Sequence, residues 1–175
     1  IGLRDEGAIF TEGFTQWVIE DDFAGPRPAW EKQGVQVVDD VAPYETAKLR
    51  LLNGAHSLLA YAGLDHGHTY VHQAIADPKL RALVKRLMLE EAAPTIDAGE
   101  DQDLASYADQ LVTRVENPAL NHRLDQIAMD GSQKIGQRWL EVLAERNYRA
   151  GLCEAILTGI AHWLHHVSGQ VRVVD

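Results

Sequence analysis

The sequence predicts a mainly α-helical protein with a short extended segment near its N-terminus. Its 175 residues, 46% hydrophobic and 24% charged, are enough for one domain with a sizeable core. From Pro43 almost to the end, apolar residues recur at helical spacing. Residues 1–42 lack that pattern, so we expect a separate region ahead of a helical domain at 43–175.

The N-terminal region is predicted to be irregular. "VQVVDDV" (35–41) is its one apolar run, and it predicts a strand or an extended connector. "DDFAGPRPAW" (21–30) contains two prolines and a glycine and predicts a loop, held by Phe23 and Trp30.

Helix boundaries follow from proline, glycine and capping residues. Asp77–Pro78 and Asn117–Pro118 each place an N-cap residue before a proline at the first helical position. Gly63 and Gly151 lie where helices are expected to stop or start. The helices expected are at about 43–62, 69–76, 78–92, 102–115, 118–145 (with a break near Gly131 or Gly136) and 150–167.

Charge and composition exclude several classes of protein. The net charge of −10, from 26 acids and 16 bases, argues against nucleic acid, and "KLRALVKR" (79–86) is typical of an amphipathic helix. No apolar run is long enough for a membrane span. The single cysteine, Cys153, favours a reducing, cytoplasmic location. The chain starts at Ile1 without a methionine or signal segment, which is compatible with a fragment.

Lys48 stands out in the apolar helix "YETAKLRLLNGAHSLLAYAG" (44–63). At about 100° per residue, Lys48 lies on the same face as Leu52, Ala55 and Leu59. The opposite pole, expected to face solvent, carries Arg50, Ser57 and Tyr61. A buried ammonium has a lowered pKa, which brings it toward the range of a general base.

Asn53 and His56 follow Lys48 on the same helix. An amide can donate to a carbonyl oxygen, and a histidine can hold hydroxyls or move protons. Alternatively, Lys48 extends along the helix to the surface, Asn53 caps a loop and His56 is a core residue. Periodicity alone leaves both interpretations open and favours the second.

The spacing K-x-x-x-x-N-x-x-H resembles the catalytic signature of the mannitol dehydrogenase family, the polyol-specific long-chain dehydrogenases. The similarity extends over 10–57, and "NPALNHRLDQIAMDGSQK" (117–134) resembles the fructuronate reductase (mannonate oxidoreductase) form of the family. The resemblance covers nearly the whole chain. It implies a multi-helical C-terminal substrate-binding domain of the 6-phosphogluconate-dehydrogenase-like type, with 1–42 as a hinge packed on it.

The resemblance also implies chemistry and partners. Family members move a hydride between NAD or NADP and a sugar acid or polyol, without a metal. Lys48 would be the general acid/base, Asn53 would polarise the carbonyl and His56 would bind substrate hydroxyls. The Rossmann domain, which holds the cofactor and a further asparagine, is absent from this sequence, so we expect the chain alone to be inactive. The sequence leaves the oligomeric state open.

Four polar residues recur every fourth position in the later block: His122, Gln126, Asp130 and Lys134. They predict either a solvated helix face or a stripe from which Lys134 and Gln126 bind substrate. We choose Lys134 as the cation for a uronate carboxylate. Mannitol or another polyol is the alternative substrate, and a non-catalytic helical interaction module is the alternative from a different class.

Histidines elsewhere raise the question of a metal. "HWLHH" (162–166) places His162 and His166 four residues apart, but it lacks the glutamate of an H-E-x-x-H site. A surface or packing role is therefore the expectation. His66, His68 and His72 are read as part of a loop, and no metal site is expected.

Overall fold

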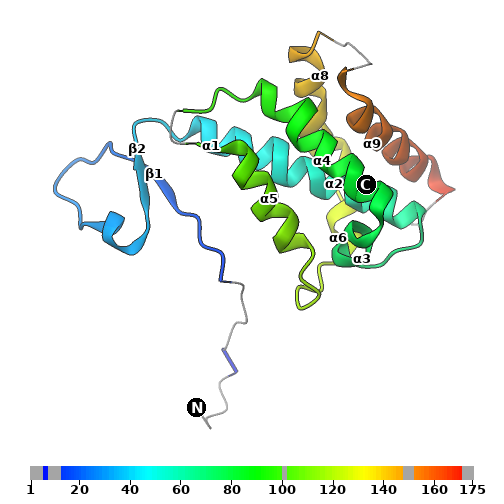
Figure 1. The fold of residues 1–175 in the computed structure, drawn as a ribbon, viewed down its shortest axis with the longest axis horizontal. Helices are drawn as coiled ribbons and strands as arrows, with labels where there is room; N and C mark the ends of the chain where they lie inside the picture. The colour runs from blue at the N-terminus through cyan, green and yellow to red at the C-terminus, as the bar shows by residue number, and fades with distance from the viewer. Residues whose placement is uncertain (1–5, 8–12, 100–101, 148–151, 171–175) are drawn as a thin grey trace. The chain divides into compact units, whose positions relative to one another are not determined.

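The chain divides into two compact units, Ile1–Val41 and Ala42–Asp175 (Figure 1). The computed structural model describes residues 6–7, 13–99, 102–147 and 152–170. In the described part, no helix is long and apolar enough to cross a membrane.

The first unit contains a small parallel sheet. Strand β1 (Val18–Glu20) pairs with β2 (Gln36–Val38), with Val18 opposite Gln36. Trp30 belongs to the segment that joins the two strands. The centroid of its ring lies 6.1 Å from that of Trp17 and 5.7 Å from that of Phe23. This confirms the expected extended run at 35–41 and the loop held by Phe23 and Trp30. Strand β1 was not predicted, because three residues are too few to show an alternating pattern.

The second unit is helical, as predicted, and several of its helices contain a wider π-helical turn. Its elements are α1 (Ala42–Ala47), π-helical η2 (Lys48–Asn53), α2 (Gly54–Asp65), α3 (Val71–Ala76), α4 (Pro78–Arg86), π-helical η3 (Leu87–Ala92), η4 (Ala93–Thr95), α5 (Leu104–Val115), α6 (Leu124–Ala128), α7 (Gly131–Ile135), π-helical η5 (Gly136–Leu140), α8 (Glu141–Glu145), α9 (Glu154–His165) and η7 (His166–Gln170). α1, η2 and α2 follow one another without a break and match the helix expected at 43–62.

Helix α2 lies at the centre of this unit and is surrounded by α3, α4, α6 and α9 (Figure 1). Leu58, Ala60 and Ala62 are fully buried, and so are Ser57 and Tyr61, which were expected to face solvent. The Tyr61 hydroxyl donates to the carbonyl of Ala128 (3.0 Å). The helix therefore has no solvent face along most of its length, and the amphipathic pattern expected for it is wrong.

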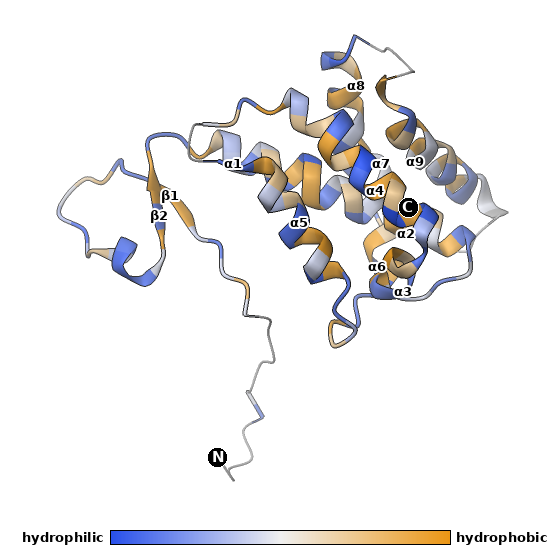
Figure 2. Cartoon of the chain, viewed as in Figure 1, coloured by the Kyte–Doolittle hydropathy of each residue, from blue (hydrophilic) through white to orange (hydrophobic). Residues whose placement is uncertain are grey.

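The outer helices keep the amphipathic pattern. In α4, Leu80 and Val84 are buried while Lys85 is exposed, as "KLRALVKR" predicted. Figure 2 shows hydrophilic and hydrophobic residues interleaved along α4 and α5. The Asp77 carboxylate accepts from the Lys79 backbone N–H (2.8 Å), which confirms the predicted cap.

The helix expected at 118–145 begins later and is interrupted. The Leu124 N–H donates to Thr69 O and the Val71 N–H to His122 O, both at 3.0 Å. These bonds hold the chain extended up to Arg123, so no helix starts at Pro118. The break falls at Met129 and Asp130, beside Gly131, where Asp130 has φ +56°. Long-range backbone pairing thus overrides the local Asn–Pro signal.

A buried carboxylate fixes the start of α9. Glu91 is 1% exposed and accepts from the backbone N–H groups of Ala155 (2.7 Å) and Ile156 (2.9 Å). It satisfies two amides that the first helical turn leaves unbonded. Cys153, just before the helix, is buried as expected, and burial raises the pKa of its thiol.

Gly159 provides a test of the central packing. A Cβ added there would lie 2.8 Å from the buried Trp139 ring, and 3.3 Å from Leu58. We expect Gly159→Ala to lower the free energy of unfolding by about 1–3 kcal/mol, measured by urea denaturation. At Gly136, a Cβ meets nothing within 4 Å. Gly136→Ala is the matched control, expected to be neutral or stabilising by about 0.5–1 kcal/mol. If Gly136→Ala lowers the free energy of unfolding as much as Gly159→Ala does, the explanation by close packing at Gly159 is wrong.

Candidate active site

Lys48 is exposed, at the first position of the π-helical segment η2. The expectation that Lys48 lies buried on the same face as Leu52, Ala55 and Leu59 is wrong for this chain. Arg50, expected at the solvent pole, is instead 7% exposed. That expectation used the rotation of about 100° per residue of a regular α-helix. A π-helical turn has a different rotation and places the residues after it on different faces.

Arg50 is buried because other helices supply its partners. Its guanidinium makes two bonds to the Glu145 carboxylate, at 2.8 and 2.5 Å, and donates to Thr95 O at 2.6 Å. A two-pronged pair of this kind is strong and geometrically specific. It anchors η2 to α8 and leaves the neighbouring Lys48 on the exposed side.

Asn53 ends the π-helical segment and is half-buried. Arg138, from η5, approaches it: its Nη1 lies 3.4 Å from Asn53 O and donates to Ser57 Oγ at 2.8 Å. Burial lowers the pKa of Arg138. Arg138 cannot be predicted from the pattern of the helix that carries Asn53, because the contact joins segments about eighty residues apart.

His56 follows one turn later and has a half-buried ring. Its Nε2 is closed off from solvent and, among the described residues, has no hydrogen-bond partner. Burial, and then the charges of His122, Arg138 and Arg114, lower the pKa of His56 to about 4. His56 also lines a small hollow, whose other walls are Leu52, Ala55, Leu59, Val84, Met88, Leu111, Val112 and Val115. The imidazole is therefore neutral at pH 7.

Lys134 and Gln126 lie on different helices, α7 and α6. The Lys134 ammonium donates to Met129 O (2.5 Å) and lies 3.8 Å from Asp130 Oδ2, whereas Gln126 is exposed. His122 precedes α6 in an extended segment. The predicted four-residue stripe along one helix is therefore wrong. In the described part, neither Lys134 nor Gln126 makes a polar contact with Lys48, Asn53 or His56.

The "HWLHH" histidines make internal contacts of the kind expected for a packing role. The Asp65 carboxylate lies 2.5 Å from His162 Nδ1 and 3.0 Å from His165 Nδ1. Although burial opposes it, these two bonds lower the pKa of Asp65. The His166 ring is buried edge-on against Tyr61, with ring centroids 5.2 Å apart.

Residues 40–173 match a family model described as the mannitol dehydrogenase C-terminal domain. The chain belongs to the mannitol dehydrogenase family. It is 44% identical over 169 residues to the D-mannonate oxidoreductase of Escherichia coli, covering 97% of this chain and 35% of that protein. It is 40% identical over 171 residues to a mannitol 2-dehydrogenase of Aspergillus fumigatus, covering 96% and 34%. The chain thus spans about a third of the length of these relatives.

Two solved dehydrogenase structures share the fold. One is the ternary complex of Pseudomonas fluorescens mannitol 2-dehydrogenase with NAD and D-mannitol (37% identity, TM-score 0.78, covering 89% of this chain and 32% of that one). The other is D-sorbitol dehydrogenase in substrate-free form (34% identity, TM-score 0.83, covering 93% and 34%). The family and the mainly helical C-terminal domain expected from the sequence are therefore confirmed.

The low pKa of His56 predicts acid sensitivity. The unfolded chain takes up a proton near pH 6.5, whereas folded His56 does so only near pH 4. Between these values the unfolded state binds more protons, so stability falls as the pH drops from 6.5 to 4. Urea denaturation across this range should show that wild type loses about 1–3 kcal/mol more than His56→Gln. Parallel curves for the two proteins would refute the prediction.

Proposed function

We propose that the protein containing this chain is a nicotinamide-dependent oxidoreductase that interconverts a keto sugar acid and its polyhydroxy acid, of the fructuronate/mannonate type. In this proposal the chain supplies the C-terminal substrate-binding domain. Support comes from membership of the family and from 44% identity to a D-mannonate oxidoreductase. The single observation that carries the site assignment is that Lys48, Asn53 and His56 lie on one uninterrupted, anchored helix.

Lys48, Asn53 and His56 each have a proposed role in the reaction. During ketone reduction the Lys48 ammonium donates a proton to the carbonyl oxygen, and in the reverse direction the amine takes the hydroxyl proton. The Asn53 amide donates a hydrogen bond to the same oxygen and stabilises its developing negative charge. Neutral His56 binds a substrate hydroxyl beside the reacting carbon.

The hydride chemistry belongs to the cofactor, which would supply or accept the hydride when bound. NAD is our first choice, since the solved relative holds NAD; NADP is the alternative. The sequence contains neither a G-x-G-x-x-G nor a G-x-x-x-x-G-K-[ST] nucleotide-binding pattern. We therefore place the cofactor on a Rossmann domain outside this chain. In this proposal that domain also covers exposed Lys48 and shields it from solvent.

The charges around His56 favour a sugar acid over a neutral polyol. The guanidinium groups of Arg138 and Arg114 lie close enough to His56 to lower its pKa, so they are near enough to attract a substrate carboxylate bound beside it. Lys134, one helical turn before Arg138, adds a further cation for a carboxylate. A mannitol or other polyol 2-dehydrogenase is the second candidate, favoured by the identity to mannitol 2-dehydrogenases.

Lys48 is tested in the full-length protein, with fructuronate and NADH or NADPH. We expect Lys48→Ala to lower kcat by about 10²–10⁴-fold, the usual contribution of a general acid. Lys79→Ala, at an exposed position on α4, is the matched control and should keep wild-type turnover.

Two results would contradict this assignment. The first is a Lys48→Ala enzyme with wild-type turnover. The second is NADH oxidation by the isolated 175-residue chain, which lacks a hydride donor site in this proposal. A full-length protein that turns over no uronate or ketose in a substrate panel would favour the non-catalytic module.

Lys134 distinguishes the sugar-acid proposal from the polyol alternative. A charge-assisted hydrogen bond to a carboxylate contributes about 1.5–3 kcal/mol. We therefore expect Lys134→Gln to raise the KM for fructuronate about tenfold or more, with little change for mannitol. Lys85→Gln on α4 is the control. An equal change in KM for both substrates would show that Lys134 does not recognise the carboxylate.

A further inference from the structure

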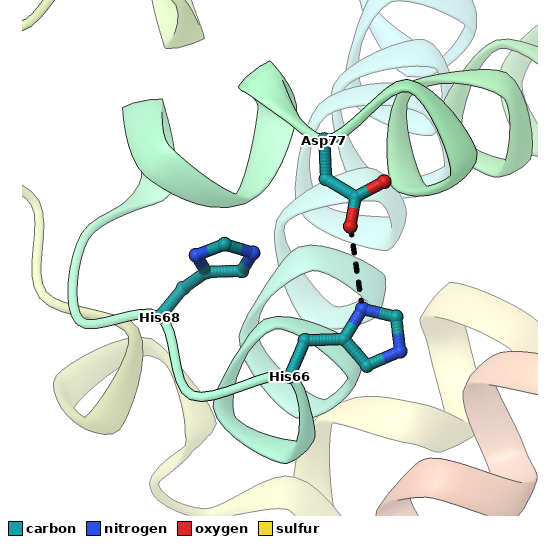
Figure 3. Close-up of side chains that lie close together, drawn as sticks. All are labelled: His66, His68 and Asp77. Carbon is teal, nitrogen blue, oxygen red and sulfur yellow. Dashed lines mark ion pairs between the residues drawn. The ribbon is translucent and has the colours of Figure 1, made fainter.

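Three side chains able to bind a metal meet at the end of α2. They are His66, His68 and Asp77, and one ligand atom of each lies within 4.8 Å of the other two. Figure 3 shows the two imidazole rings and the carboxylate turned toward one another. They lie at the opposite end of the helix from Lys48, roughly 25 Å away by helical rise. The group is therefore separate from the proposed site of hydride transfer.

The turn that carries the two histidines is fixed by its backbone. Gly67 has φ +80°, a conformation that glycine adopts readily. Three N–H groups bond back to the last turn of α2: His66 to Ala62 O (3.0 Å), Gly67 to Leu64 O (3.0 Å) and His68 to Gly63 O (2.8 Å). The rings thus start from a held backbone, which reduces the entropy lost when they bind an ion.

Asp77 is oriented by the cap that it forms. Its Oδ1 accepts from the Lys79 N–H at 2.8 Å, while Oδ2 lies 3.5 Å from His66 Nδ1. Two nitrogen or oxygen ligands at about 2.0–2.1 Å from tetrahedral zinc lie roughly 3.3 Å apart. The observed separation therefore fits two ligands of one ion.

We propose that His66, His68 and Asp77 bind one divalent transition-metal ion of the zinc type, with water in the fourth position. His66 is exposed, so solvent reaches the ion from that side. The ion replaces the weak His66–Asp77 ion pair. It ties the turn after α2 to the start of α4 and stabilises the fold. The nearby Asp65 already contacts His162 and His165 and is not a ligand.

Zinc titration of the full-length protein, first stripped of metal with a chelator, tests the site. Isothermal titration calorimetry should find a zinc site in wild type that His66→Gln/His68→Gln weakens by at least about 100-fold, since loss of a mere outer-shell partner costs about 10–100-fold. Zinc should also raise the Tm of wild type and not that of the variant. His66→Gln alone replaces the double variant if the latter does not fold by circular dichroism.

The matched control removes two histidines from the neighbouring cluster. His162→Gln/His165→Gln should keep the zinc affinity and the zinc-dependent rise in Tm. Unchanged zinc binding in the His66/His68 variant would overturn the proposal, as would a wild-type protein that binds no zinc. Loss of binding in the control variant alone would assign the metal to the "HWLHH" tract and overturn it as well.

Discussion

The burial of α2 on every side is the constraint on which the helical unit depends. A helix without a solvent face needs small side chains wherever a neighbour approaches closely, and glycine and alanine provide them. At Gly63, an added Cβ would lie 2.8 Å from Leu124 and 2.9 Å from Ala74. At Gly54 the backbone carbonyl instead accepts from the Trp139 indole N–H at 3.2 Å. Packing of this density fixes α2, and with it the positions of Asn53 and His56.

Arg50 and Lys48 show the two positions that a cationic side chain can take on such a helix: buried with hydrogen-bond partners, or exposed to solvent. Arg50 is buried because Glu145 and Thr95 satisfy its guanidinium, and a planar fork suits that arrangement better than an ammonium. In the part of the chain that the structure describes, Lys48 has no comparable set of acceptors, and it is exposed. The buried arginine holds the helix in place, while the lysine lies at the surface, as its proposed role in proton transfer requires.

The sequence predicted the features that depend on local patterns. The helix carrying Lys48, the Asp77 cap and the amphipathic α4 all follow from spacing and residue type within a few positions. Three features do not follow from such local patterns. They are the burial of Arg50 with the exposure of Lys48, the extended segment before Leu124 and the approach of Arg138. Each depends on a partner far away in the chain or on the π-helical turn, and a helical wheel or a capping rule includes neither. The prediction of Lys48, Asn53 and His56 as site residues rests on the family signature and does not depend on that burial.

The π-helical segment between Lys48 and Asn53 has an evolutionary consequence. Such a segment is equivalent to one extra residue accommodated within an α-helix. Without that residue, everything on one side would turn by about 100° relative to the other. The spacing K-x-x-x-x-N-x-x-H therefore encodes a three-dimensional arrangement only together with the bulge. A relative that had lost one position in this segment would retain the three residue types but present them on different faces.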